Sequence, residues 1–296
     1  MKQQVFSGCG TALITPFHAG EIDYAALKSL IRQQLAAGVD ALIVCGTTAE
    51  AATLTREERR ELIAFVIREA DHKIPVIVGT GSNNTAQAIV LSEEAQKLGA
   101  DALLVVTPYY NKATQEGLIE HFTAIAQSVS PLPIILYNVP SRTGVSCTAD
   151  TYRELSKVEN IVGVKEASGN FSLIQATRRL CGDTFAIWSG NDEDTAALAL
   201  LGGSGVISVA SNLLPQTISA LTKLCRCGRY EEAGQLQVAL APLIKALFCE
   251  VNPIPIKTAL AAKGLCCEEF RLPLCPMSEA NKKELLNVLE EYCDLK

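Results

Sequence analysis

The feature that most constrains the fold is a regular alternation of short apolar runs and amphipathic stretches along most of the 296 residues. Eight runs are almost continuously hydrophobic, which is typical of strands covered on both faces in a parallel sheet. They occupy residues 11–15, 41–45, 75–79, 102–106, 133–137, 161–165, 185–188 and 205–209. Eight strands alternating with helices predict an α/β fold of the (β/α)8 TIM-barrel type. A doubly wound sheet is the alternative, but no GxGxxG sequence follows the first run.

Residues that favour helix ends mark the stretches between these runs. Asp23 precedes one amphipathic stretch, and Thr55 with Glu58 three residues later forms a capping-box pattern. Further candidate N-caps are Asn84, Thr114, Thr148 and Asn170. Several stretches end near a glycine, namely Gly38, Gly99 and Gly182. These signals support the alternation of helices with strands.

The last part of the chain has a different pattern. Residues 229–296 show no strand pattern and predict helices near 229–248, 254–263 and 278–293. No linker rich in Pro, Gly or Ser precedes them. We therefore expect a barrel over residues 1–228 that carries the active site, and a C-terminal helical region over 229–296 packed on it.

Composition narrows the class of protein. The formal net charge is −6 and there is no basic patch, which argues against a nucleic-acid partner. The first 17 residues lack the apolar run of a signal peptide, and no run reaches the roughly 18 apolar residues of a membrane span. We expect a cytoplasmic protein with no membrane partner.

The eleven cysteines do not suggest a metal site. An odd number of cysteines without a signal peptide indicates reduced thiols, and their dispersal predicts that most are small core residues. Cys225-x-Cys227 and Cys266-Cys267 lack the paired spacing of zinc ligands. The three histidines are far apart in the sequence, so no metal site is expected.

Lys165 ends the apolar run at 161–165, where a charged amine is costly unless it is paired or neutralised. A lysine in an apolar pocket can act as a nucleophile and form a Schiff base with a carbonyl substrate. The ordinary alternative is a lysine at a strand end whose amine reaches solvent. The residues at the ends of the other predicted strands distinguish between these two interpretations.

Active sites of barrels lie at the carboxyl ends of the strands. The residues there are Thr47 and Thr48 after the second run, Tyr109 and Tyr110 after the fourth, Tyr137 and Arg142 after the fifth, Lys165, Gly190 and Ile207. Hydroxyls and phenols can transfer protons, backbone N–H groups near Thr48 can hold a carboxylate, and a guanidinium can bind a second carboxylate through two hydrogen bonds. Singly, each residue could serve only a loop, a cap or a surface charge. Together with a lysine on one rim they favour an active site.

These segments resemble those of the pyruvate-dependent class I aldolases, the N-acetylneuraminate lyase family. The similarity runs nearly end to end and is most specific in Tyr137-Asn138-Val139-Pro140-Ser141-Arg142-Thr143-Gly144. The other matching segments are ALITPF at 12–17, GTT at 46–48, VTPYYN at 106–111, VKEA at 164–167, 203–208 and NPIPIK at 252–257. Within the family, the pattern is that of the lyases that condense pyruvate with L-aspartate-4-semialdehyde, the first committed step of diaminopimelate and lysine biosynthesis.

The resemblance implies a role for each residue. Lys165 would carry the Schiff base with pyruvate, and Tyr137, Thr47 and Tyr110 would relay protons. Tyr110 would reach a neighbouring site across a tight dimer interface of a homotetramer. The substrate-binding set would be Thr48 for the pyruvate carboxylate, Arg142 for the semialdehyde carboxylate, Ile207 through its main chain, and Gly190. The resemblance implies no cofactor.

The chain departs from the family pattern at two places. Ala49 replaces a glycine in the turn at 46–50, so a positive φ there would be strained by about 1 kcal/mol. At the lysine-feedback site of sensitive relatives, Asn83 and Tyr109 remain. Arg56, Arg59 and Gln87 stand where those relatives have histidines and a glutamate. Added positive charge disfavours a cationic ligand, so we expect weak or absent inhibition by L-lysine.

Two other functions fit parts of the pattern. N-acetylneuraminate lyase or a 2-keto-3-deoxy-sugar-acid aldolase would use the same imine, but a sugar acceptor needs neutral hydrogen-bonding groups in place of Arg142. A non-catalytic barrel that serves as a scaffold would be expected to lack Lys165 or the phenols, and all are present.

Overall fold

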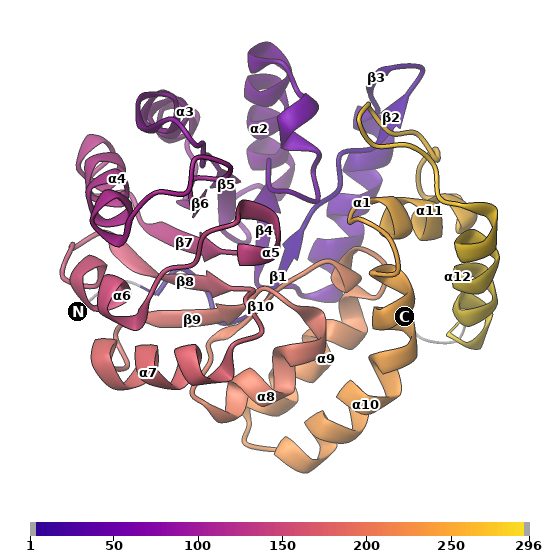
Figure 1. Cartoon of the computed structure of the whole chain (residues 1–296). Helices are drawn as coiled ribbons and strands as arrows, with labels where there is room; N and C mark the ends of the chain where they lie inside the picture. The colour runs from indigo at the N-terminus through magenta and orange to yellow at the C-terminus, as the bar shows by residue number, and fades with distance from the viewer. Residues whose placement is uncertain (1–3, 293–296) are drawn as a thin grey trace.

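The computed structural model describes residues 4–292. Eight parallel strands close into one barrel because β1 pairs with both β4 and β10, as the predicted fold requires (Figure 1). The strands are β1 (Gly8–Ala12), β4 (Ala41–Val44), β5 (Val76–Gly79), β6 (Ala102–Val106), β7 (Ile134–Asn138), β8 (Ile161–Glu166), β9 (Ala186–Ser189) and β10 (Gly205–Ser208). Closure leaves no open sheet edge, so the doubly wound alternative is wrong.

The first strand is displaced from its predicted position. It spans Gly8–Ala12, whereas the apolar run predicted 11–15. Glycines at positions 8 and 10 argue against a strand in the sequence, yet Gly10 is needed because a Cβ there would lie 2.8 Å from the ring of Phe6. A small hairpin of β2 (Phe17–His18) and β3 (Glu21–Ile22) follows and was not predicted.

Helices surround the barrel, and all six predicted N-caps are confirmed by side-chain hydrogen bonds to backbone N–H groups. The helices of the barrel are α1 (Tyr24–Ala37), α2 (Arg56–Ala70), α3 (Thr85–Lys97), α4 (Gln115–Ser128), α5 (Pro140–Thr143), α6 (Ala149–Leu155), α7 (Phe171–Cys181), α8 (Thr195–Leu200) and α9 (Pro215–Arg226). Asp23 caps α1, and Thr55 with Glu58 forms the capping box of α2. Asn84, Thr114, Thr148 and Asn170 cap α3, α4, α6 and α7. Each such cap contributes about 1 kcal/mol, so the helix starts are fixed locally.

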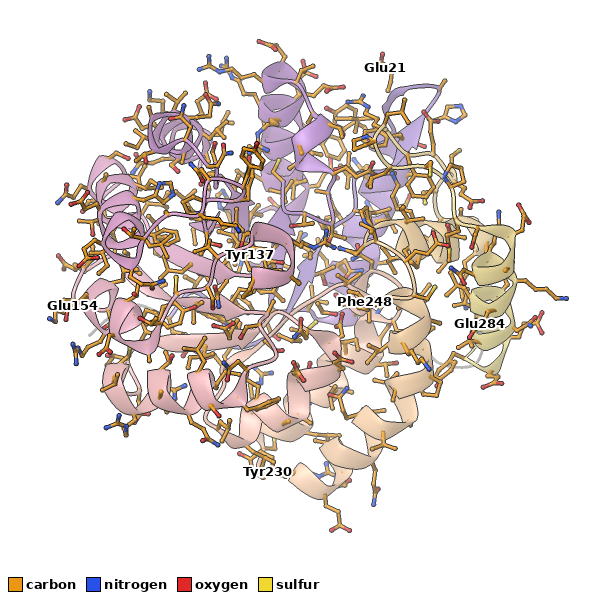
Figure 2. All side chains as sticks on the ribbon, in the orientation of Figure 1. Glu21, Tyr137, Glu154, Tyr230, Phe248 and Glu284 are labelled. Atoms are coloured by element: carbon orange, nitrogen blue, oxygen red, sulfur yellow. The ribbon has the colours of Figure 1, made fainter. Side chains whose placement is uncertain are left out.

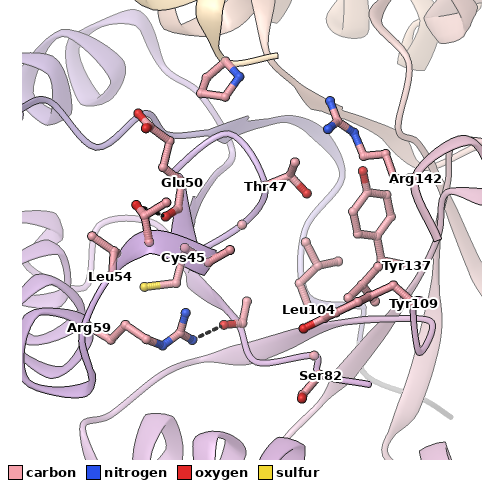
Figure 3. A pocket seen from close by; sticks show the side chains of 18 of the residues that line it. Cys45, Thr47, Glu50, Leu54, Arg59, Ser82, Leu104, Tyr109, Tyr137 and Arg142 are labelled. Atoms are coloured by element: carbon pink, nitrogen blue, oxygen red, sulfur yellow. Dashed lines mark hydrogen bonds between the residues drawn. The ribbon is translucent and has the colours of Figure 1, made fainter. Parts of the chain in front are cut away.

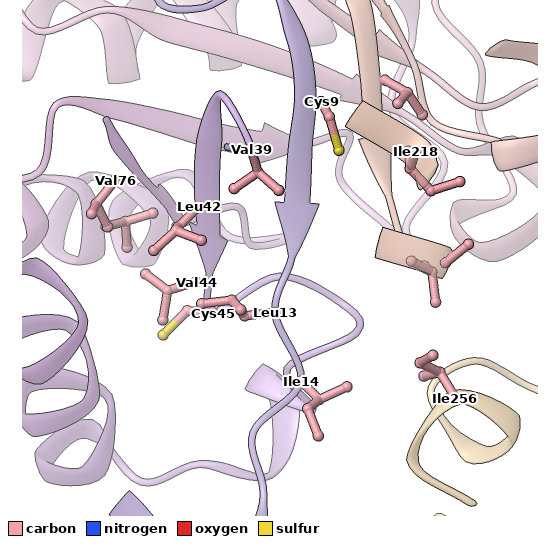
Figure 4. Close-up of a cluster of buried hydrophobic side chains, with 14 of the residues drawn as sticks. Cys9, Leu13, Ile14, Val39, Leu42, Val44, Cys45, Val76, Ile218 and Ile256 are labelled. Carbon is pink, nitrogen blue, oxygen red and sulfur yellow. The ribbon is translucent and has the colours of Figure 1, made fainter. Parts of the chain in front are cut away.

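The core has an inner and an outer layer. Inside the barrel, Phe6 stacks on the fully buried Trp188 with 5.1 Å between ring centroids, among apolar side chains from every strand. The larger outer layer lies between strands and helices (Figure 4). Filling the barrel this way makes its interior a packed core, which confines open space to its ends.

The C-terminal helices form part of the same core. They are α10 (Tyr230–Leu247), α11 (Ile254–Ala262) and α12 (Glu279–Glu291), close to the predicted ranges. Helix α10 packs on α8 and α9, and Ile256 of α11 belongs to the same buried cluster as Ile14 and Cys9 (Figure 4). The boundary predicted after residue 228 falls in the turn between α9 and α10 and remains a prediction.

Cysteine burial differs from the prediction. Ten cysteines within the described range are free thiols, and only Cys9, Cys45, Cys147 and Cys225 are buried. The prediction that most serve as core residues is therefore wrong. Exposed cysteines such as Cys227 and Cys249 lie in the turns next to α9 and α10, where the apolar periodicity ends. None of the described helices is long and apolar enough to cross a membrane.

Candidate active site

Lys165 lies at the carboxyl end of β8, opposite Tyr137 on β7. The residue is 6 % exposed, and its Nζ lies 4.4 Å from the centroid of the Tyr137 ring. Neither a hydrogen bond nor an ion pair within 4.0 Å connects the Lys165 amine to another residue of the described range. Side chains alternate between the two faces of a strand, so Lys165 and Tyr137 share the inner face. The amine is thus buried, beside a phenol, and free to react.

The next residues on the same two strands form a hydrogen-bonded network on the outer face. Asn138 donates through Nδ2 to both carboxylate oxygens of Glu166, at 3.0 and 3.2 Å. The Tyr152 hydroxyl donates to Glu166 Oε2 at 2.9 Å. Burial raises the pKa of Glu166, and these hydrogen bonds oppose that rise. The network fixes the register between β7 and β8 and therefore the approach of Lys165 to Tyr137.

A second buried carboxylate, Asp192, supports the end of β10. It accepts hydrogen bonds from the Ser208 hydroxyl and from the backbone N–H groups of Val209 (2.9 Å) and Ala210 (3.1 Å). Burial raises the pKa of Asp192, whereas hydrogen bonds and the charge of Lys165 lower it. The network residues Asn138 and Glu166 and this carboxylate were all missed in the sequence. The signal available there was a polar residue one or two positions after Tyr137, Lys165 and Gly190.

A cavity of about 510 Å³ opens beside Tyr137 at the end of β7. Figure 3 shows Thr47 facing Tyr137 and Arg142 across it. Tyr109 and Asn252 also line the cavity. Lys165 contacts the Tyr137 ring but is not among the lining residues, and neither are Thr48, Gly190 and Ile207. Figure 2 places Tyr137 near the centre of the ring of helices, with Glu154 and Glu284 at its edge.

The turn after β4 carries Thr47 and Thr48. Cys45 and Glu50 bound it, and both have left-handed backbones, with φ of 55° and 53°. Each such residue costs about 1–2 kcal/mol of backbone strain. Ala49 is not among the residues with positive φ, so the substitution of glycine at this position introduces no such strain. The conformation at the end of the turn is held by Glu50, whose buried carboxylate lies 2.5 Å from Lys257 Nζ.

Thr48 and Arg142 are linked through one residue of the C-terminal region. Asn252 donates through Nδ2 to Thr48 Oγ1 at 3.0 Å, and its carbonyl accepts from Arg142 Nη2 at 3.3 Å. Arg142 lies on the short helix α5, directly after β7, and is exposed. Asn252 therefore connects the two predicted carboxylate-binding groups, of which Arg142 lines the cavity.

Tyr110 is the predicted site residue that the chain does not bring to its own cavity. Its side chain is 88 % exposed and its backbone is left-handed, with φ of 75°. Its N–H donates to the carbonyl of Thr143 at 3.2 Å, which ties the loop to the end of α5. The loop thus holds the phenol outward, into solvent.

The remaining two predicted residues lie next to the reactive strands. Ile207 is fully buried on the inner face of β10. At Gly190, a Cβ would lie 3.1 Å from Lys165 Cε and 2.5 Å from Ala167 Cβ. Glycine at this position therefore makes room for the aliphatic chain of Lys165.

The same cavity is lined by four of the residues at the expected lysine-feedback position, Arg56, Arg59, Gln87 and Tyr109, but not by Asn83. Arg56 pairs with Glu94, and Arg59 donates to the carbonyl of Gly79 at 2.7 Å. Asn83 accepts through its carbonyl from Asn111 Nδ2 at 3.0 Å. No carboxylate pairs with Arg59 among the described residues, so this part of the cavity is cationic. Within the described range, no group of three or more His, Cys, Asp or Glu side chains is arranged to hold a metal ion.

Comparisons with known proteins agree with this geometry. The model of the dihydrodipicolinate synthetase family matches residues 5–292. The chain is 50 % identical to a 4-hydroxy-tetrahydrodipicolinate synthase of Thermoanaerobacter sp., over 99 % of this chain and 98 % of that protein. A dihydrodipicolinate synthase structure from Thermotoga maritima matches with a TM-score of 0.95 and 45 % identity, covering 97 % of this chain and 99 % of that one.

A third match is the chloride-inhibited dihydrodipicolinate synthase of Acinetobacter baumannii, whose structure holds pyruvate. It has a TM-score of 0.94 and 42 % identity, and the match covers 97 % of this chain and 99 % of that one. Each match is close and nearly full-length, so the chain belongs to the dihydrodipicolinate synthetase family.

Proposed function

We propose that this chain condenses pyruvate with L-aspartate-4-semialdehyde to form 4-hydroxy-tetrahydrodipicolinate, the activity named for its relatives, through a Schiff base on Lys165. The observation that carries the proposal is that Lys165 is 6 % exposed and its unpaired amine lies beside the Tyr137 ring. The match over residues 5–292 supports the choice of reaction. Arg142 on the cavity wall supports an acceptor with a carboxylate rather than a sugar.

The chemistry begins when the neutral amine of Lys165 attacks the ketone carbon of pyruvate. Loss of water gives a protonated imine, which withdraws electrons and acidifies the methyl group. Removal of a methyl proton gives an enamine, and its carbon attacks the aldehyde of the semialdehyde to form the new C–C bond. The amine of the second substrate then attacks the imine carbon. This closes the ring and releases Lys165.

Tyr137, Thr47 and Tyr110 are the proposed proton relay. Tyr137 and Thr47 line the same cavity, within reach of a small substrate. Tyr110 points away from its own cavity with 88 % of its side chain exposed. We propose that it completes the site of a neighbouring subunit in a tight dimer, and that two such dimers form a homotetramer.

The substrate-binding roles follow from position. Thr48 donates to the carboxylate of pyruvate, and the main chain of Ile207 contacts the same substrate. Arg142 binds the carboxylate of the semialdehyde with two hydrogen bonds. Gly190 contributes by leaving space for Lys165.

The test is product formation from the two substrates by the purified chain, compared with the Arg142→Ala variant. We expect wild-type turnover, and in the variant a loss of kcat/KM for the semialdehyde of about 10²-fold, the size of a lost charged hydrogen-bonding group. Imine formation with pyruvate should be nearly unchanged. Equal loss of both would contradict the role of Arg142, and product from a sugar aldehyde instead would contradict the proposed acceptor.

A further inference from the structure

The turn that carries Thr47 and Thr48 is held from outside the barrel. Its end residue Glu50 has a left-handed backbone, which its own sequence does not favour. The Glu50 carboxylate lies 2.5 Å from Lys257 Nζ, and both side chains are 0 % exposed. Its second oxygen accepts from the backbone N–H of Arg271 at 3.2 Å. Lys257 and Arg271 both belong to the C-terminal region.

The same C-terminal segment also reaches the hydroxyl of Thr48. Asn252 lies five residues before Lys257, and Lys257 N–H donates to the carbonyl of Pro253 at 3.0 Å at the start of α11. Asn252 Nδ2 donates to Thr48 Oγ1 at 3.0 Å, and both residues are buried. One short stretch of chain therefore anchors Glu50 through charge and Thr48 through a hydrogen bond.

The direction of the Thr48 hydrogen bond has a chemical consequence. A hydroxyl has one hydrogen to donate, and Thr48 Oγ1 accepts from Asn252. Among the residues that the structure describes, none accepts the Thr48 hydrogen. That hydrogen is left for a ligand, and a carboxylate can only accept. Asn252 thus selects the donor orientation of Thr48 that an anionic substrate requires.

We propose that Asn252 and the Glu50–Lys257 ion pair are positioning residues that preset the Thr47–Thr48 turn for the carboxylate of pyruvate. This inference rests on the proposed function, because it concerns the pyruvate subsite. The C-terminal region is then a required part of the pyruvate site, although it contributes no reacting group.

The surroundings of Lys257 explain why loss of its amine would disturb the turn that carries Thr48. Lys257 Nζ also lies 4.4 Å from the Phe17 ring centroid and 5.1 Å from that of Phe270, so aromatic rings cover the amine beside Glu50. Loss of the amine leaves Glu50 as a buried unpaired carboxylate at the end of the turn. The turn would then move to hydrate that carboxylate, which displaces Thr48.

The experiment compares three variants with the wild type by steady-state kinetics in both substrates: Asn252→Asp, Lys257→Met and the control Lys282→Met. Asn252→Asp puts an acceptor where Thr48 needs a donor. Lys257→Met removes the buried charge with little change in volume. Lys282→Met breaks a partly exposed ion pair with Glu268 in the same region. Far-UV circular dichroism and borohydride trapping at saturating pyruvate accompany each assay.

We expect Asn252→Asp and Lys257→Met to raise the KM for pyruvate by about 10- to 100-fold. The KM for the semialdehyde should change little, because Arg142 contacts only the main-chain carbonyl of Asn252. Trapping at saturating pyruvate should still reach Lys165, and Lys282→Met should match the wild type. If Lys257→Met does not fold, Asn252→Asp decides the question.

Unchanged KM for pyruvate in a folded Asn252→Asp variant would overturn the inference, and so would an equal rise in both KM values. Failure of the proposed function is distinguishable, since the wild type itself would then not be trapped on Lys165.

Discussion

Among residues 4–292, two lysines are almost completely buried, and they lie in opposite chemical environments. Lys165 is 6 % exposed at the end of β8, and Lys257 is fully buried in α11. Each amine lies 4.4 Å from the centroid of an aromatic ring, that of Tyr137 for Lys165 and that of Phe17 for Lys257. Burial and contact with a ring are therefore common to both and do not separate them.

The two lysines differ in whether a carboxylate lies close to the amine. Lys257 has Glu50 at 2.5 Å, whereas none lies within 4.0 Å of Lys165 in residues 4–292. Asp192 senses the charge of Lys165, but its oxygens already accept from Ser208, Val209 and Ala210. Burial lowers the pKa of Lys257, the charge of Glu50 opposes this shift, and the Lys257 amine donates to the Glu50 carboxylate. A buried lysine becomes a candidate nucleophile only when no neighbouring carboxylate stabilises its protonated form.

The largest expected difference between the two lysines is in activity. Lys165→Met removes the nucleophile and should lower turnover by at least about 10³-fold. Its free energy of unfolding should be unchanged or higher, because an unpaired buried amine is replaced by an apolar chain of similar volume. Turnover assays and urea unfolding of the purified variant check both. Residual activity above one tenth of the wild type would remove Lys165 from the mechanism.

The second difference is in stability. Lys257→Met leaves Glu50 buried without a partner and should lower the free energy of unfolding by about 3–5 kcal/mol. The double variant Glu50→Gln/Lys257→Met should recover part of this, because the buried carboxylate is gone. Urea unfolding monitored by circular dichroism measures both. A loss below about 1 kcal/mol in the single variant would show that the pair is not a structural anchor.

Gly190→Ala sharpens the comparison because, of the two buried lysines, it crowds Lys165 and not Lys257. The added Cβ would lie 2.5 Å from Ala167 Cβ and 3.1 Å from Lys165 Cε. We expect a loss of about 1–3 kcal/mol in unfolding free energy together with slower imine formation. Gly234→Ala is a matched control, since nothing lies within 4 Å of a Cβ at that position. Equal trapping rates in the two variants would argue against a role for Gly190 in making room for Lys165.

Acid should lower the stability contributed by an ion pair close to Lys257. Arg271, which donates to Glu50, also forms an ion pair with Glu58 at 2.6 Å. Hydrogen bonding from Arg271 lowers the pKa of Glu58 from 4.5 to about 2. A lowered folded-state pKa gives stability that is present above the unfolded pKa and is lost as the pH falls toward about 2. The side chain is only partly buried, so the effect is about 1 kcal/mol or less.

The measurement for the acid effect is urea unfolding at pH 5 and pH 3 for the wild type and for Glu58→Gln. The wild type should lose more stability than the variant over this interval. A larger loss in the variant would mean that Glu58 does not contribute through its charge.

The smallest expected effect is that of L-lysine. The outer part of the cavity holds Arg56 and Arg59, and only Arg56 is paired with a described carboxylate. A cationic ligand is disfavoured there, so millimolar L-lysine should leave turnover nearly unchanged. An inhibition constant in the micromolar range would contradict this.

Much of the fold was predictable because its signals are local. Strand runs, the Thr55–Glu58 capping box and the glycines after helices each depend on a few neighbouring residues, and the structure confirms them. The start of β1 was predicted three residues late because Gly8 and Gly10 serve close packing between distant segments, which composition does not reveal.

The site was only partly predictable, because some of its contacts join residues that are far apart in the sequence. The structure brings Thr47, Tyr137 and Arg142 together at one cavity, as expected for strand ends of a barrel. The contacts of Asn252 with Thr48 and of Lys257 with Glu50 join residues 204 and 207 positions apart. No local pattern encodes such pairs, and Lys257 read alone looks as reactive as Lys165.

The most direct test of the difference between the two lysines is borohydride treatment of the intact protein with pyruvate, followed by peptide mapping in a mass spectrometer. We predict a pyruvate-derived adduct on Lys165 and an unmodified Lys257. An adduct on Lys257, or none on Lys165, would contradict the claim that the absence of a carboxylate partner marks the reactive amine.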